Sequence, residues 1–245
     1  MLLKDIINKS VYGTIGYIDS QESLDLLEQY IVYNLPILSE FKQVIVATNY
    51  KEYPTYVSEN SQLWKKYFPD CILLDSKINR GHQLGTADLD NMLVNYCKSN
   101  NIDWLCKSAN DVILTPHLLT KEVDAADFYF LMSVGVAGLR QHNFDLEDAF
   151  NNAFTPQTNF YIINISKIDE LNSEHDMIHV TICENMLERC VLRNNLKKYN
   201  LIPNDKYIKL IHMVYNTQIH DSSHKNILIE GVCHYHFPNQ ISIEL

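Results

Sequence analysis

The sequence has no CxxC pair and no cysteine spacing typical of a secreted disulfide framework. Its six cysteines are scattered through apolar segments (Cys71, Cys97, Cys106, Cys183, Cys190 and Cys233). Cysteines spaced in this way are typical of reduced, mostly buried thiols. The amino terminus also lacks a long apolar core followed by a small-residue cleavage site, which a signal peptide would have. These absences favour a cytoplasmic protein.

Long apolar runs and an excess of basic residues are missing as well. The longest apolar run, Phe128–Leu139, is broken by Ser133, Gly135 and Gly138 and is shorter than the roughly 20 residues of a membrane-spanning helix. The formal net charge of −10 repels a phosphate backbone, so general nucleic-acid binding is disfavoured. A phosphate compound would need a metal ion, a few placed Arg or Lys residues, or backbone N–H groups to hold it. We therefore expect neither a transmembrane segment nor a nucleic-acid partner.

No internal repeat, low-complexity tract or Pro/Gly/Ser-rich linker divides the chain. With 245 residues, of which 46% are hydrophobic, the protein can bury a large core without a metal or disulfide staple. We expect a single domain over residues 1–245. The sequence leaves the oligomeric state open.

The first half of the chain alternates apolar strands with amphipathic helices. Strands are predicted at Val11–Ile18, Gln43–Thr48, Cys71–Leu74 and Asp103–Cys106, and helices at Ser23–Leu38, Gln62–Phe68 and Gln83–Lys98. Successive Val and Ile residues suggest strands that are covered on both faces, as parallel strands are. The fold class predicted from this order is α/β, with a mostly parallel open sheet and helices on both faces.

The second half has a different pattern. Strands are predicted at Ala126–Val136, Asn159–Ile165, Tyr207–Tyr215 and Asn226–Phe237, a helix at Thr181–Tyr199, a polar segment at Phe144–Ala153 and a loop at Thr155–Asn159. This mixed order suggests that residues 11–116 form a half that binds a common cofactor. Residues 117–245 would then shape the site of a particular partner.

The stretch Asn79–Pro116 organises the first half. It reads as a Gly-containing turn, a helix, a short turn at Asn100–Asn101, and a strand that ends in a polar corner at Ser108–Asp111. A helix that returns the chain to a parallel sheet and leaves a carboxylate at a strand's carboxyl end builds a ligand crevice. We expect the chemistry at this corner.

The order of these features resembles the GT-A family of nucleotide-sugar-dependent glycosyltransferases, whose fold is nucleotide-diphospho-sugar transferase-like. Three short motifs carry the resemblance: Ile15–Asp19 after the first strand, Asn79-Arg80-Gly81 behind the third, and Lys107–Val112 at the end of the fourth. The last looks like the Lys-Thr-Asp-Asp-Asp-Val form of the family's acidic motif. The resemblance implies a nucleotide-diphosphate sugar as donor and a glycan-type acceptor, which is carbohydrate or lipid-linked.

The acidic motif departs from the family pattern. Ala109 and Asn110 replace two carboxylates and leave Asp111 alone. The family corner holds a divalent ion, Mn or Mg, that stabilises charge on the leaving phosphate. Three alternatives follow: other residues complete the metal site, basic groups such as Arg80 and Lys107 replace the metal, or catalysis has been lost.

Two late histidines are candidates to complete the metal site. His234 and His236 are two residues apart, so on a strand both would point to one face. Members of the family often supply a late histidine ligand. The alternative is that they belong to a polar strand end at the surface or to a packed edge.

An inverting enzyme of this family needs a carboxylate that removes the acceptor proton. Glu184 lies at the matching place in element order, and Asp176 is the reserve candidate. The alternative is that Glu184 is a surface carboxylate stabilised by its helix dipole.

Polar and aromatic residues also follow the first two strands. Tyr17 and Asp19, with Thr48 and Asn49, would surround the nucleotide base and ribose, because a ring stacks on a base and a carboxylate accepts from hydroxyls. By the same resemblance Asn79, Arg80, Lys107 and Asn110 are donor-binding candidates. The alternative for Tyr17 and Asp19 is a turn residue and a helix cap. Thr155–Asn159 is predicted to be an acceptor-side loop.

The leading hypothesis is a glycosyltransferase. A sugar nucleotidyltransferase is the less favoured alternative, because Ile15–Glu22 has one glycine and no basic residue, unlike the Gly-rich, Arg-containing loop of that class. A non-catalytic sugar- or nucleotide-binding descendant remains open because the acidic motif is eroded. A dinucleotide-dependent dehydrogenase is disfavoured, since no GxGxxG turn follows a strand.

Overall fold

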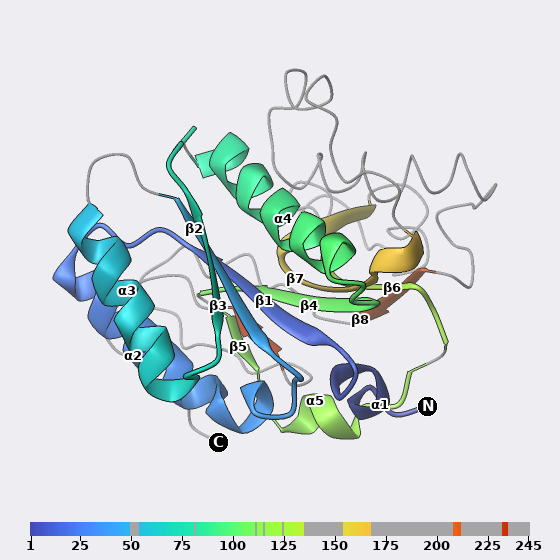
Figure 1. Cartoon of the computed structure of the whole chain (residues 1–245). Coiled ribbons are helices and arrows are strands. Elements are labelled where there is room, and N and C mark those ends of the chain that lie inside the picture. Colours follow the sequence, from blue (N-terminus) through green and yellow to red (C-terminus); the bar gives the residue numbers. More distant parts are fainter. Residues whose placement is uncertain are drawn as a thin grey trace.

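A computed structural model of the chain describes residues 1–49, 54–80, 82–110, 112–114, 116–123, 125–134, 154–167, 208–211 and 232–234 (Figure 1). Within these residues the strands form two sheets. The larger is seven-stranded, in the order β3-β2-β1-β4-β7-β6-β8, and the smaller pairs β5 with β9. The described helices are arranged around the larger sheet.

The first four strands of the large sheet are parallel, as predicted. They are β1 (Val11–Gly16), β2 (Val44–Asn49), β3 (Ile72–Ser76) and β4 (Trp104–Ala109). β1 lies between β2 and β4, and β2 pairs with β3, all in parallel register. β2 is buried along its whole length, as expected for a strand covered on both faces.

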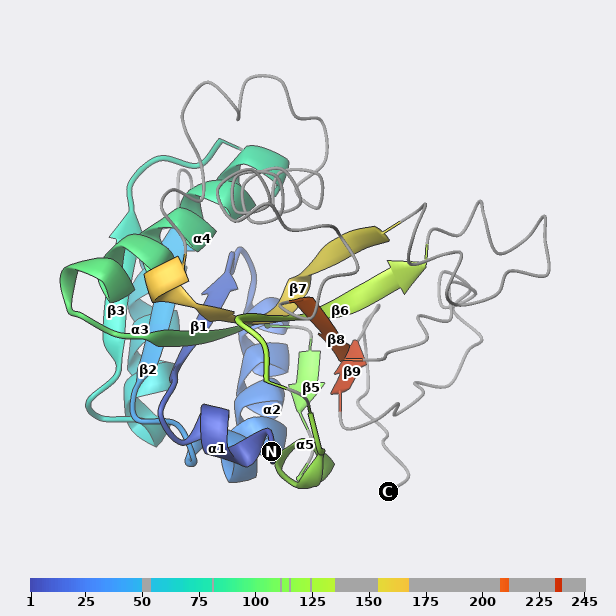
Figure 2. The same ribbon diagram turned by 90° about the vertical axis from the view of Figure 1, so that its right-hand side faces the viewer.

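Helices cover both faces of this parallel region, which confirms the predicted fold class (Figures 1 and 2). The described helices are α1 (Lys4–Ile7), α2 (Gln21–Leu38), α3 (Pro54–Tyr67), α4 (His82–Ser99) and α5 (His117–Thr120). α2 and α3 lie on one face and α4 on the other. α3 begins earlier than the predicted Gln62, because proline suits the first turn of a helix and Pro54 starts it.

The two faces bury different cores. Under α2 and α3 the core is rich in aromatic rings, including Tyr12, Tyr30 and Trp64. Under α4 it is mostly aliphatic and includes Ile45 and Leu93. Burial of such side chains is the main favourable term in folding.

The predicted turn at Asn100–Asn101 is confirmed as the cap that ends α4. Asn101 has a φ of 54°, in the left-handed region that asparagine tolerates. The N–H of Ile102 donates to the carbonyl of Cys97 at 2.9 Å, and that of Asn101 to Lys98 at 3.3 Å. This capped end directs the chain straight into β4.

The second half of the sheet is mixed, as predicted. It contains β6 (Phe128–Val134), β7 (Phe154–Asn164) followed by the short helix η1 (Ile165–Lys167), and β8 (Ile208–Ile211). β7 is antiparallel to both β4 and β6, whereas β8 is parallel to β6. The small sheet pairs β5 (Val112–Leu114) with β9 (Val232–His234).

The prediction of a loop at Thr155–Asn159 is wrong, because this segment is part of β7. Thr155 pairs with Ser133, and Pro156 with Met132. The ladder between β7 and β4 ends at Phe160, so the first half of β7 has one described neighbour. Proline has no backbone N–H to donate to a neighbouring strand. It is therefore tolerated in a strand segment that pairs on one side.

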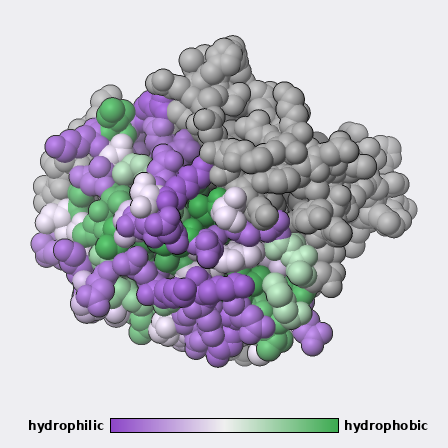
Figure 3. Space-filling model, turned by 45° about the vertical axis from the view of Figure 1, so that its right-hand side comes forward, coloured by the Kyte–Doolittle hydropathy of each residue, from purple (hydrophilic) through white to green (hydrophobic). Residues whose placement is uncertain are grey.

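The predicted helix Thr181–Tyr199 and the polar segment Phe144–Ala153 lie outside the described residues. No helix among the described residues combines the length with the apolar composition of a membrane-spanning segment. In the view of Figure 3, hydrophilic residues spread over the described surface, with smaller hydrophobic areas between them.

Candidate functional site

The carboxyl ends of the parallel strands collect most of the described residues that the sequence predicted for a ligand site. Asn49 ends β2, Asn79 and Arg80 lie between β3 and α4, and Asn110 follows β4. Tyr17 and Asp19 follow β1. In open α/β sheets ligands bind outside this edge, where the crossover direction changes. The fold thus places these predicted residues along one edge of the large sheet.

A glycine brings the ends of β1 and β4 together. β1 and β4 are neighbours, with Ile15 opposite Ala109. A Cβ on Gly16 would lie 3.2 Å from Nδ2 of Asn110, which is tighter than ordinary van der Waals contact. The absence of a side chain at Gly16 therefore lets the Asn110 carboxamide close over the end of β1.

The residues after β1 decide whether Asp19 caps the following helix, which the sequence left open. Ser20 is the N-cap of α2, and its Oγ accepts a hydrogen bond from the N–H of Ser23 at 3.1 Å. Asp19 lies one residue earlier, and its Oδ1 accepts from the Ser23 hydroxyl at 3.1 Å. Asp19 supports the start of the helix without capping it and remains exposed. The Tyr17 side chain is also accessible, because 38% of the residue is exposed.

Two carboxamides approach the first turns of α4 from β2 and from the turn after β3. A Cβ on Gly85 would lie 2.9 Å from Nδ2 of Asn49 and 3.4 Å from Oδ1 of Asn79. Asn49 is buried, with 5% exposed. Gly85 therefore provides the space in which the Asn49 side chain approaches the helix, and a larger residue would displace it.

Arg80 is held at the same place by a carboxylate of α4. Its Nε donates to Oδ2 of Asp88 at 2.7 Å, and its Nη2 pairs with Oδ1. This two-point contact orients the planar guanidinium. The Arg80 side chain is 35% exposed, so part of it is accessible at the ligand edge.

Lys107 lies elsewhere than the sequence suggested. Side chains alternate along β4, and Lys107 points to the α4 face, where it is 1% exposed. Its Nζ is 3.5 Å from Oδ1 of Asp90, which also accepts from the Tyr161 hydroxyl at 3.1 Å. Burial raises the pKa of Asp90, and the Lys107 charge opposes this. The Lys107 ammonium thus belongs to an interior ion pair that joins α4 to the sheet, and this burial keeps it from a solvent-side diphosphate.

The residues predicted for metal binding and catalysis fall largely outside the described part of the chain. Asp111, His236, Glu184 and Asp176 all lie there. His234 is described as the end of β9, and in the ladder with β5 it stands opposite Val112, the residue after Asp111 in the sequence. Among the described residues no three His, Cys, Asp or Glu side chains gather as a metal site.

A buried asparagine fixes β5, the strand that starts directly after Asp111. Asn34 of α2 is fully buried. Its Nδ2 donates to the carbonyl of Val112 at 3.1 Å, and its Oδ1 accepts from the N–H of Leu114. One carboxamide therefore satisfies two backbone groups of β5 and sets its position against α2.

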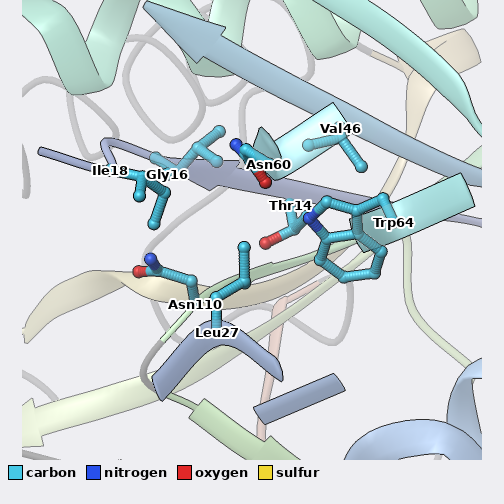
Figure 4. A pocket seen from close by; sticks show the side chains of 9 residues that line it. Thr14, Gly16, Ile18, Leu27, Val46, Asn60, Trp64 and Asn110 are labelled. Carbon is cyan, nitrogen blue, oxygen red and sulfur yellow. The ribbon is translucent and has the colours of Figure 1, made fainter. Parts of the chain in front are cut away.

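The sequence reasoning missed a pocket beneath the end of β1, on the α2 and α3 face (Figure 4). It is lined by Thr14, Ile15, Gly16, Ile18, Leu27, Val46, Asn60, Trp64 and Asn110. One signal was present in the sequence. Asn60 interrupts an otherwise aromatic stripe at four-residue spacing, between Tyr56 and Trp64 on α3.

Comparison with known proteins assigns no family to the chain. No family model matches it. A curated relative, regulator of telomere elongation helicase 1 from Bos taurus, is 33% identical over 94 residues, which are 38% of this chain. The match spans 8% of that protein's length. Such a short overlap does not assign this chain to the helicase's family.

Solved structures match the fold over most of the chain. Glucosyl-3-phosphoglycerate synthase from Mycobacterium tuberculosis, in complex with Mn²⁺, UDP and glucosyl-3-phosphoglycerate, has a TM-score of 0.50 at 10% identity. The match covers 87% of this chain and 75% of that one. Two further matches have lower TM-scores. 4-Diphosphocytidyl-2C-methyl-D-erythritol synthase from Anaerococcus prevotii scores 0.47 at 11% identity (86% and 89% covered). Inositol-1-phosphate CTP transferase from T. maritima scores 0.48 at 10% (82% and 84% covered). With its strand order and its two-sided helix layer, the chain has the nucleotide-diphospho-sugar transferase fold.

Proposed function

We propose that the protein is a glycosyltransferase that binds a nucleotide-diphosphate sugar along the carboxyl edge of β1, β2 and β4. The observation that carries the proposal is the convergence of polar side chains at this edge. Asn110 closes over Gly16, while Asn49 and Asn79 approach Gly85. Carboxamides offer both donors and acceptors, which suits ribose hydroxyls and phosphate oxygens.

The other described residues at this edge also have roles in the proposal. The exposed ring of Tyr17 stacks on the base, and Asp19 accepts from a ribose hydroxyl. Arg80, oriented by Asp88, donates from its outer edge to the diphosphate. The start of α4, which has no acidic residue in its first turn, adds a favourable dipole for an anion.

The metal and the general base are proposed from the sequence and from one structural relation. The β5–β9 register brings the backbone of His234 opposite the residue that follows Asp111. We propose Asp111, His234 and His236 as ligands of a divalent ion; a carboxylate with two imidazoles fits a transition-metal ion such as Mn²⁺ better than Mg²⁺, which prefers oxygen ligands. A bound ion would neutralise charge that develops on the leaving diphosphate. Glu184, with Asp176 in reserve, would take the proton of the acceptor hydroxyl.

The first experiment measures thermal stability with UDP, GDP, CDP and ADP, each with and without Mn²⁺. A ligand that binds only the folded state raises Tm. We expect one nucleoside diphosphate to raise Tm, and more so with Mn²⁺. If none of them changes Tm at millimolar concentration, the proposal is wrong.

Variants then separate binding from turnover. Asp111→Asn should remove the metal-dependent part of the Tm shift. Asp103→Asn, at the opposite end of the same strand region, is the matched control and should leave it unchanged. Glu184→Gln should bind normally but lose sugar transfer, by about 100-fold or more. Full activity of Glu184→Gln would reject its assignment as the base.

The non-catalytic alternative has one observation in its favour, the eroded acidic motif, in which Ala109 and Asn110 stand where the GT-A motif has carboxylates. It predicts the same Tm shifts with no release of nucleoside diphosphate from any nucleotide sugar. Release of pyrophosphate from a nucleoside triphosphate and a sugar phosphate would instead identify a nucleotidyltransferase.

A further inference from the structure

The pocket beneath the end of β1 is separate from the edge residues to which the proposal above gives roles, apart from Asn110 and Gly16 at its border. It encloses about 190 Å³ of empty space including its open mouth, with room for a group about the size of a water molecule. Figure 4 shows Gly16, Ile18 and Asn110 on one side and Thr14 and Trp64 on the other, with Asn60 above. The pocket therefore begins where the candidate donor site ends.

Two buried polar atoms in this pocket lack a partner within the described chain. They are Oγ1 of Thr14 and Oδ1 of Asn60, on residues that are 2% and 3% exposed. Leaving a buried polar group unpaired is unfavourable. Because two such atoms line the same small space, one group could satisfy both.

The fold explains why these atoms meet. Thr14 and Gly16 share the face of β1 that looks toward α2 and α3, and Thr14 stands opposite Val46 of β2. Asn60 lies one turn before Trp64 on α3, so both point toward the sheet. The remaining walls are apolar, formed by Ile18, Leu27, Val46 and Trp64. Water competes poorly for polar contacts in such surroundings.

We propose that this pocket reads the base of the donor nucleotide by accepting its exocyclic amino group. An amino group has two N–H donors and is small enough for the space. Asn60 Oδ1 can only accept, and the Thr14 hydroxyl can accept or donate, so both atoms would be satisfied at once.

The chemistry makes the preference directional. A base that carries a carbonyl at the same position, such as uracil, would set its oxygen against Asn60 Oδ1 and leave that acceptor unpaired. Sites built to hydrogen-bond a substrate group discriminate strongly against an analogue that lacks it. The inference rests on the proposed function and adds the class of donor: a sugar linked to a cytidine- or adenosine-type diphosphate instead of a uridine-type one.

The experiment uses two ligand pairs that differ in this group and in the hydrogen on the ring nitrogen beside it. CDP and UDP differ by an amino group and a carbonyl at one ring position, and so do ADP and IDP. Binding constants are measured by calorimetry with Mn²⁺ present. We expect wild-type protein to bind the amino member of at least one pair about tenfold or more tightly than the carbonyl member.

Thr14→Val and Asn60→Leu remove one acceptor each and keep the approximate volume. Each should lower the affinity for the amino member several-fold and change the affinity for the carbonyl member by no more than about twofold. The ratio of the two affinities should therefore fall. Ser61→Ala is the matched control on α3, because the Ser61 hydroxyl donates to the Val57 carbonyl instead of lining the pocket. It should leave the ratio unchanged.

Three outcomes separate the inference about the base from the proposed function. An amino preference that both variants reduce supports the inference. Binding of nucleoside diphosphates with no amino preference, or with a preference that Thr14→Val and Asn60→Leu leave intact, overturns it and leaves the proposed function standing. Absence of binding by all four ligands overturns the inference, and absence of binding by GDP as well overturns the proposed function.

Discussion

Under α4 the parallel strands bury an ion pair in an aliphatic core, whereas under α2 and α3 they bury hydroxyls and carboxamides among aromatic rings. On the α4 face Lys107, Asp90 and Tyr161 contact one another. On the other face the hydroxyls of Tyr12, Tyr30 and Ser108 form a hydrogen-bonded triangle.

The difference lies in what is left unsatisfied. The polar groups named on the α4 face satisfy each other, so their arrangement is complete without a ligand. The α2 and α3 face combines satisfied groups with the unpaired oxygens of Thr14 and Asn60 near the strand ends. The satisfied groups thus stabilise the fold, whereas the unpaired oxygens of Thr14 and Asn60 are the ones that we propose for ligand binding.

The largest expected effect comes from breaking the ion pair on the α4 face. Lys107→Ala leaves the Asp90 carboxylate buried without its cation and should lower the free energy of unfolding by about 3–5 kcal/mol. Urea denaturation measures this loss of stability. The double variant Lys107→Met with Asp90→Asn removes both charges and keeps an acceptor for Tyr161, so its loss should be smaller. An equal or greater loss in the double variant would show that the charges themselves do not matter.

A somewhat smaller effect is expected from the satisfied part of the α2 and α3 face. Asn34→Leu leaves the carbonyl of Val112 and the N–H of Leu114 unpaired, which should cost about 2–4 kcal/mol. Denaturation gives the stability. Ser39→Ala, at the exposed end of the same helix, is the control and should leave the free energy of unfolding unchanged. A loss under about 0.5 kcal/mol for Asn34→Leu would mean that water replaces the side chain in these bonds.

The third prediction has the opposite sign. Thr14→Val replaces an unpaired buried hydroxyl with a methyl group of similar shape, so stability without ligand should stay equal or rise by up to about 1 kcal/mol. Thermal denaturation without nucleotide tests it. A clear loss of stability would show that the Thr14 hydroxyl already has a partner in the folded protein.

The smallest effect is expected at the surface between α2 and α3. Lys66 pairs with Glu28 at 2.6 Å, but both side chains are exposed. Solvent screens such pairs, so Lys66→Ala should leave Tm unchanged within error. A measurable drop would mean that the contacts of Glu28 with both Lys66 and Tyr67 act as a network.

Local pattern was enough to predict the parallel half. The apolar runs and the helix spacing place β1, β2, β3 and β4 to within a few residues, because each buried element repeats a period that its own residues show. The pattern failed at Thr155–Asn159, where polar residues and a proline suggested a loop. Strand pairing with β6 overrode that local preference.

Site residues were harder to predict. Lys107 is next to the polar corner in sequence, yet one step along a strand reverses the direction of a side chain, and it lies in the core beside Asp90. Asn60 was overlooked because a polar residue on a helix is usually exposed. Its burial depends on the position of α3 against β1 and β2.

The sequence by itself determined the α/β alternation and the polar strand ends, since these depend on residue type and spacing along the chain. Tertiary structure decided which polar groups meet: Asn110 with Gly16, Asn49 and Asn79 at Gly85, Lys107 with Asp90, and Thr14 with Asn60 around one pocket. The physical reason is that hydrogen bonds and ion pairs act over a few ångströms. Only the folded chain brings residues so far apart in sequence within that distance.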